Sequence, residues 1–131
     1  MLFRSNDEII HYFFIMLANR DAQRASANNG RRCHFFKSFF ITKLLDEGVT
    51  NRYNYSNVKR WSRNVPGKDV FSLDKIFIPV NMSNVHWACV VVFLQEKKIQ
   101  FFDSMGGDGT HTFTFLSCFN LIQICLIKCC V

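Results

Sequence analysis

A histidine and an aspartate stand beside two apolar runs in the second half of the chain. His86 comes at the start of one run, and Asp103 directly follows the next run, Ile99–Phe102. If the two runs pair as a hairpin, the imidazole and the carboxylate meet at one end of a sheet. A carboxylate in that place fixes the histidine tautomer and stabilises the imidazolium, as a general base requires. The spacing therefore predicts a His-Asp dyad that needs a nucleophile.

On this pattern alone, a packed or solvent-exposed histidine is the more common role for such a residue. Other chemistry is weakly indicated. The six cysteines and four histidines show no paired Cys-x-x-Cys spacing, so we expect no metal site. Cys89 is most simply a packed strand residue. The cysteines near the end of the chain have apolar neighbours, which raise a thiol pKa, so we predict no nucleophile among Cys118, Cys125, Cys129 and Cys130.

The composition is that of a chain with a hydrophobic core and a basic surface. Of the 131 residues 49% are hydrophobic, and 15 are phenylalanine, which argues against disorder. A formal net charge of +6 favours an acidic partner. Because the basic residues form no long block, we expect a solvated basic surface and no nucleic-acid partner.

The chain shows no targeting or membrane-spanning pattern. Asp7 and Glu8 precede the first apolar stretch, and no small-residue cleavage site follows it, so the protein should not be secreted. Its cysteines should then be reduced, and a nuclear or cytoplasmic location is expected. Polar residues interrupt the apolar segment from Phe113 onward, so no membrane partner is expected.

Two helices are predicted in the first part of the chain. Ser5-x-x-Glu8 matches a capping box, and apolar residues at steps of three and four predict a helix to about Asn19. Polar residues 20–32 predict a loop. A second helix is expected from His34 to Asp46, with Gly48 placed as a C-terminal cap, and a short helical piece at Val58–Trp61.

The periodicity then changes to that of strands. Runs at 75–80, 87–94 and 99–102 are rich in β-branched and aromatic residues, and the polar segment 95–98 predicts a hairpin turn. Helices followed by strands indicate an α+β fold with a mainly antiparallel sheet. We expect residues 1–111 to form this partial domain and 112–131 to be a divergent apolar, cysteine-rich tail.

Seven short motifs occur in an order that resembles the Ulp1/sentrin-specific protease family. They are Asp7-Glu-Ile-Ile, Phe39-Phe-Ile-Thr-Lys-Leu, Val58-Lys-Arg-Trp-Ser, Asp69-Val-Phe-Ser, Ile78-Pro-Val, Val85-His-Trp and Phe102-Asp-Ser-Met-Gly-Gly. The resemblance implies an incomplete papain-like α+β cysteine protease, without cofactors, that cleaves after the Gly-Gly terminus of SUMO. Its partners would be SUMO and SUMO-conjugated proteins.

The resemblance also implies roles for individual residues. His86 matches the general base, Asp103 its orienting carboxylate, and Trp87 one wall of the tunnel that admits glycines. Four further residues match positions that face SUMO: Asp7, Phe39, Arg60 and Trp61. For Phe39 and Trp61, packing in the core is an equally good interpretation.

Two departures from the family pattern bear on activity. Arg4 stands where the family has a second tunnel tryptophan. The Gln-x-x-x-Asp-Cys-Gly motif, which supplies the nucleophilic thiol, does not occur in the 131 residues. We therefore expect a truncated peptidase that is inactive as given, or alternatively a non-catalytic SUMO-binding pseudoenzyme.

Overall fold

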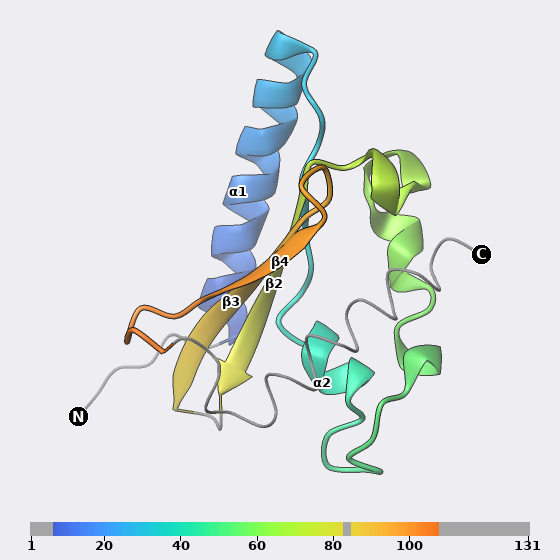
Figure 1. The fold of residues 1–131 in the computed structure, drawn as a ribbon, viewed down its shortest axis with the longest axis vertical. Helices are drawn as coiled ribbons and strands as arrows, with labels where there is room; N and C mark the ends of the chain where they lie inside the picture. Colours follow the sequence, from blue (N-terminus) through green and yellow to red (C-terminus); the bar gives the residue numbers. More distant parts are fainter. Residues whose placement is uncertain (1–6, 83–84, 108–131) are drawn as a thin grey trace.

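The computed structural model describes residues 7–82 and 85–107, in which one long helix lies beside a four-stranded sheet (Figure 1). The long helix is α1, Asp7–Asn28. The strands are β1 (His34–Phe35), β2 (Lys75–Met82), β3 (His86–Phe93) and β4 (Lys98–Phe102). The second helix, α2 (Phe40–Leu44), and four short 3-10 turns, η1 (Tyr55–Asn57), η2 (Trp61–Asn64), η3 (Pro66–Lys68) and η4 (Val70–Ser72), connect β1 to β2.

The sheet has the strand order β1-β2-β3-β4. β1 runs parallel to β2, whereas β2 with β3 and β3 with β4 are antiparallel. The predicted α+β class with a mainly antiparallel sheet is confirmed, as is the hairpin between the last two strands. Its turn places Lys97 at φ 53°, a left-handed conformation typical of tight turns.

One face of the sheet carries the main core. Ile76, Ile78, Val90 and Val92 alternate along β2 and β3, so their side chains share a face, and each is at most 4% exposed. Leu44 of α2 packs into the same cluster and is 0% exposed. The segment that carries the 3-10 turns contributes the buried residues Val58, Val65, Val70 and Leu73.

Aromatic rings link α1 to strands β1 and β2 of the sheet. Phe14 of α1 meets Phe35 edge to face with ring centroids 5.6 Å apart, and Phe35 stacks on Phe77 at 4.8 Å. Such pairs contribute beyond their buried area. The predicted apolar face of the helix is covered only in part, because Phe13 and Met16 are 51% and 63% exposed.

The helix α1 is longer than predicted. The expected loop at 20–32 is wrong for its first part, since α1 continues to Asn28 and the Gly30 N–H still bonds back to the Ala25 carbonyl. The added residues include three alanines, which favour helix. The buried residues of α1 are Asp21 and Ala25, both in this added part.

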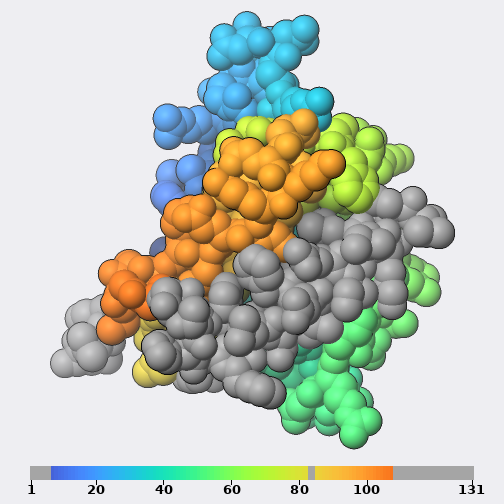
Figure 2. Space-filling model, viewed as in Figure 1, coloured from blue at the N-terminus to red at the C-terminus, as the bar shows by residue number. Residues whose placement is uncertain are grey.

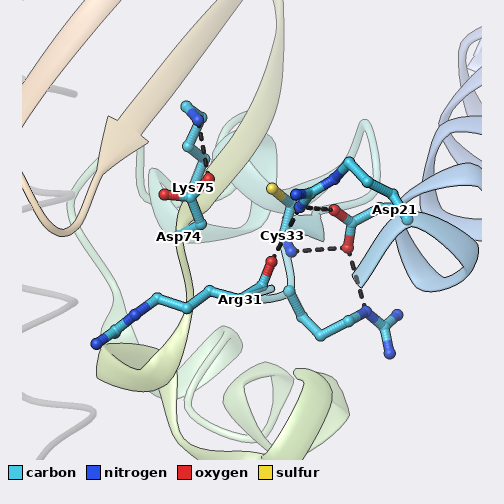
Figure 3. A network of polar contacts seen from close by, with 7 residues as sticks. Asp21, Arg31, Cys33, Asp74 and Lys75 are labelled. Carbon is cyan, nitrogen blue, oxygen red and sulfur yellow. Dashed lines mark hydrogen bonds and ion pairs between the residues drawn. The ribbon is translucent and has the colours of Figure 1, made fainter. Parts of the chain in front are cut away.

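Asp21 joins the helix to the chain that returns from it (Figure 3). Its carboxylate accepts hydrogen bonds from the Cys33 backbone N–H at 2.8 Å, from Arg32 at 3.1 Å and from Arg24 at 2.9 Å. Burial alone would raise the pKa of this carboxyl, but the hydrogen bonds from Arg24, Cys33 and Arg32 hold it below its ordinary value. The three donors replace the hydration that this buried carboxylate loses, and they tie this part of the helix to the returning chain.

The predicted helix from His34 to Asp46 is wrong in its first half. His34 and Phe35 pair with Ile76 and Phe77 as strand β1, and the helix is confined to Phe40–Leu44. Pairing with a distant strand has overridden the local helical spacing. Gly48 has φ +79° as its expected role requires, but it lies in a turn beyond the helix end.

The short helical piece predicted at Val58–Trp61 is displaced by a few residues, since η1 ends at Asn57 and η2 begins at Trp61. A turn follows at Pro66-Gly67, with Gly67 at φ +72°. Within residues 7–82 and 85–107 no helix is long and apolar enough to cross a membrane. The capping-box residue Ser5, the departure at Arg4 and the expected tail at 112–131 lie outside the described residues, so the domain boundary stays a prediction.

His34 should make the stability of the fold depend on pH. Burial lowers its pKa to about 4, because the charged imidazole would lose hydration. The unfolded state, with an ordinary pKa near 6.5, binds more protons between these values. The contribution of His34 to the free energy of unfolding should therefore be fully present above pH 6.5. The free energy of unfolding should fall by roughly 1 to 3 kcal/mol as the pH is lowered toward 4.

Urea unfolding at pH 6.5 and pH 5 measures this effect in a range where most carboxylates stay ionised. His34→Phe keeps an aromatic ring beside Phe36. In this variant the free energy of unfolding should differ less between pH 6.5 and pH 5. An unchanged difference in that variant would assign the pH dependence to other groups.

Candidate active site

The predicted dyad is assembled by the β3–β4 hairpin. His86 is the first residue of β3, and Asp103 directly follows the end of β4, where Phe102 pairs with Cys89. Antiparallel pairing thus brings the two side chains to the same end of the sheet. Nε2 of His86 is hydrogen-bonded to Oδ1 of Asp103. Figure 2 shows the β4 side of the hairpin on the near surface of the molecule.

The carboxylate of Asp103 is held in place by a second donor. The backbone N–H of Met105 donates to its Oδ1 at 2.9 Å. The Met105 N–H and, next, the His86 ring hold the pKa of the Asp103 carboxyl below its ordinary value. Its side chain is 9% exposed and that of His86 is 23% exposed, so the pair is largely screened from solvent while the imidazole stays accessible.

This geometry determines which ring nitrogen can act as a base. Because Nε2 faces the carboxylate, Nδ1 is the nitrogen that can face a nucleophile or a substrate proton. A carboxylate on one nitrogen stabilises the imidazolium that forms when the other accepts a proton. The pair can therefore serve as a general base.

Neither described thiol lies in surroundings that would activate it as a nucleophile. Burial raises the pKa of Cys89 to about 11. Burial, followed by the nearby Asp21 charge, also raises the pKa of Cys33. Both side chains are therefore protonated at neutral pH, as the packing role predicted for Cys89 requires. The remaining cysteines belong to the part of the chain beyond residue 107, which the structure does not describe.

Of the other predicted site residues, Trp87 adjoins the dyad, whereas Asp7, Phe39, Arg60 and Trp61 come from the first half of the chain. Trp87 follows His86 in β3 and is half-buried. Asp7 is the first residue of α1 and is also half-buried. Phe39 precedes α2 and is 50% exposed, so its side chain is not fully packed in the core.

Arg60 and Trp61 stand next to each other at the start of η2. Arg60 is exposed. The Trp61 ring is half-buried and lies 5.5 Å from Phe40 and 6.3 Å from Phe36, centroid to centroid. Trp61 therefore packs against the core while part of its surface stays accessible. Because Trp61 contacts Phe40, it lies near Phe39, the residue before Phe40.

Among residues 7–82 and 85–107 no group of three or more histidine, cysteine or acidic side chains is arranged to hold a metal ion. The sequence interpretation missed the part played by the segment after Asp103. The backbone N–H of Met105 has no side-chain signature, but the glycine pair that follows could have indicated a tight turn around the carboxylate.

Residues 5–129 match the profile of a family described as the Ulp1 protease family, C-terminal catalytic domain. Ubiquitin-like-specific protease 1A of Arabidopsis thaliana is 39% identical over 103 residues, which are 78% of this chain and 20% of that protein. Sentrin-specific protease 2 of Homo sapiens is 33% identical over 104 residues, covering 79% of this chain and 15% of that protein.

Solved structures show the same fold. The C-terminal Ulp1 protease domain in complex with Smt3, the yeast orthologue of SUMO, matches with a TM-score of 0.66 and 29% identity, over 96% of this chain and 50% of that chain. SUMO protease Ulp1 with its catalytic cysteine oxidised to a sulfenic acid matches with a TM-score of 0.72 and 28% identity, over 94% of this chain and 48% of that chain. The chain thus spans about half of these solved domains and a fifth or less of the two curated relatives.

Proposed function

The chain belongs to the Ulp1 protease family, and we propose that it carries the general-base half of a SUMO-specific cysteine peptidase site. The observation that carries this proposal is the contact of His86 Nε2 with the Asp103 carboxylate at the end of the hairpin. In this role Nδ1 of His86 takes the proton of a cysteine thiol. The thiolate then attacks the carbonyl carbon of the second glycine of SUMO, and the amine leaves with the proton that His86 had taken. Water hydrolyses the resulting thioester, which frees the SUMO carboxylate and regenerates the thiol.

The substrates would be SUMO precursors and SUMO-conjugated proteins, in keeping with the solved Ulp1 protease domain that is bound to Smt3, the yeast orthologue of SUMO. Trp87, next to the base, is proposed to line the passage for the two glycines. No cofactor, nucleic acid or membrane takes part in this scheme. A nuclear or cytoplasmic location suits a protein that meets SUMO conjugates and keeps its thiols reduced.

The 131-residue chain contains no Gln-x-x-x-Asp-Cys-Gly sequence, and its described cysteines are protonated at neutral pH. We propose that a protein of these residues alone has no peptidase turnover. A base without a thiolate to generate has no reaction to catalyse.

The second candidate function is SUMO binding without cleavage. It is supported by the exposure of Phe39 and Arg60, which match SUMO-facing positions of the family, and by the accessible part of Trp61. Asp7 is proposed to belong to the same binding surface. An aromatic side chain beside an arginine is typical of the residues that dominate protein interfaces.

Calorimetric titration with mature SUMO tests the binding surface. Arg60→Glu should weaken binding about tenfold, equivalent to ~1.4 kcal/mol, because it places a negative charge opposite an acidic partner. Raising the salt concentration should also weaken binding. Arg20→Glu on α1 is the matched control, since it makes the same charge change at another exposed position.

Two results would count against this surface. Absence of saturable SUMO binding by the parent chain would remove the binding function altogether. Equal weakening by Arg60→Glu and Arg20→Glu would show that only net charge matters.

A further inference from the structure

The segment after β4 folds back on Asp103 through three successive backbone N–H groups. Met105 N–H donates to the carboxylate Oδ1 at 2.9 Å. Gly106 N–H donates to the Asp103 carbonyl oxygen at 3.1 Å. The Gly107 N–H also hydrogen-bonds to Asp103 and helps to lower the pKa of its carboxyl. The loop thus holds both the backbone and the carboxylate of Asp103, and its Met105 N–H shares Oδ1 with His86.

The two glycines meet two different requirements of this loop. Gly106 has φ +78°, a left-handed conformation that is strained for residues with a Cβ atom, although a Cβ there would meet nothing within 4 Å. A Cβ on Gly107 would lie 2.5 Å from Oδ2 of Asp103, closer than non-bonded atoms can approach. Gly106 therefore allows the turn, and Gly107 leaves the space that the carboxylate occupies.

The nearest atoms to such a Cβ on Gly107 are Oδ2, Cγ and Cβ of Asp103 itself. Relief of the collision must therefore move either the Asp103 side chain or the loop that binds it. Both movements change the carboxylate that His86 contacts. A glycine that served only to end the strand would not need to lie so close to the Asp103 side chain.

We propose that Gly106 and Gly107 are positioning residues, which shape the loop after β4 into a cradle that holds the Asp103 carboxylate against Nε2 of His86. The proposal deepens the function proposed above, because it concerns the same base. The cradle acts through Asp103 and touches no substrate. By fixing the carboxylate, the cradle fixes which nitrogen of the imidazole is hydrogen-bonded. Nδ1 is thereby kept directed toward the reacting thiol.

The test is an NMR comparison of the full chain with three glycine variants. The first readout is the downfield Nε2–H proton signal of His86, assigned by its loss in His86→Ala. The second is the carbon-13 titration of the Asp103 carboxyl. Gly107→Ala and Gly106→Ala alter the cradle. Gly48→Ala is the control, because Gly48 has a nearly identical φ of +79° with nothing within 4 Å of an added Cβ.

Gly106→Ala and Gly48→Ala should lower the melting temperature by similar amounts, since each forces alanine into the same left-handed conformation. Only the two cradle variants should lose the downfield signal, and in both the Asp103 carboxyl pKa should rise toward its ordinary value. If Gly107→Ala fails to fold, Gly106→Ala against Gly48→Ala decides the question.

Retention of the signal and of the lowered Asp103 pKa in the folded cradle variants would overturn the proposal. Loss of both in Gly48→Ala as well would also overturn it, because the effect would then follow from general destabilisation. Neither readout depends on SUMO or on peptidase turnover. Failure of the cradle is therefore distinguishable from failure of the proposed function.

Discussion

Replacement of His86 by alanine should lower cleavage of a SUMO precursor by about three to four orders of magnitude in an active form of this domain. Such a form can be made by joining residues 1–107 to the remaining part of the catalytic domain of the Arabidopsis thaliana relative, with its nucleophilic cysteine. The loss is large because an unassisted thiol is mostly protonated at neutral pH and its proton has no acceptor. Initial rates of precursor processing on gels or by mass spectrometry measure the effect.

Asp103→Asn in the same chimera should also be severely impaired, because an amide can no longer stabilise the imidazolium. Arg20→Ala, at an exposed position on α1, should leave the rate unchanged. The 131-residue chain should show no turnover in parallel assays. Cleavage by that chain that disappears in His86→Ala would show that one of its own cysteines is the nucleophile and would contradict our proposal.

Leu44→Ala should destabilise the fold by about 3 to 5 kcal/mol, a large part of the stability of a small domain. Leu44 ends α2, is 0% exposed and belongs to the cluster formed with Ile76, Ile78 and Val90 of the sheet. Truncation removes apolar contact from both layers and leaves a cavity between them. Urea unfolding followed by circular dichroism gives the free energy change.

Val49→Ala is the matched control, because Val49 is 78% exposed and its truncation should change stability by less than about 0.5 kcal/mol. A change below about 1 kcal/mol for Leu44→Ala would mean that the core can collapse around the smaller side chain. That result would contradict the close packing of α2 against β2 and β3.

The dyad geometry could be predicted from sequence because the information is local. Alternating apolar residues on both sides of a short polar turn specify the hairpin and its register, and the register places Asp103 beside His86. Val90, Val91 and Val92 are each at most 4% exposed, because β3 lies between two strands and its continuous apolar run is covered on both faces.

The wrong predictions fall where distant residues decide the structure. Residues 20–28 stay helical because Asp21 binds groups of residues 32 and 33 beyond the end of the helix. His34 and Phe35 become a strand because β2, far along the chain, provides the pairing edge. Helical spacing among the phenylalanines could not reveal that edge, since a local pattern carries no information about a remote partner.

The cradle around Asp103 was missed for another reason. Its donors are backbone N–H groups, which every residue except proline possesses, so no side-chain type marks them. Only the paired glycines at 106 and 107 carried a signal, and a turn was its simplest interpretation. The closeness of an added Cβ to the carboxylate follows from the three-dimensional path of the loop, which a sequence pattern does not specify.

The contrast between the local hairpin and the remote β1–β2 pair has a kinetic consequence. Closing a chain loop costs conformational entropy that rises with the logarithm of loop length. The hairpin encloses residues 94–97, whereas β1 pairs with β2 only after residues 36–75 are enclosed, an added cost of roughly 2 kcal/mol. Hairpins form within about 1 to 10 μs. His86 and Asp103 can therefore meet early in folding, before the contact of Phe14 with Phe35 joins α1 to the sheet.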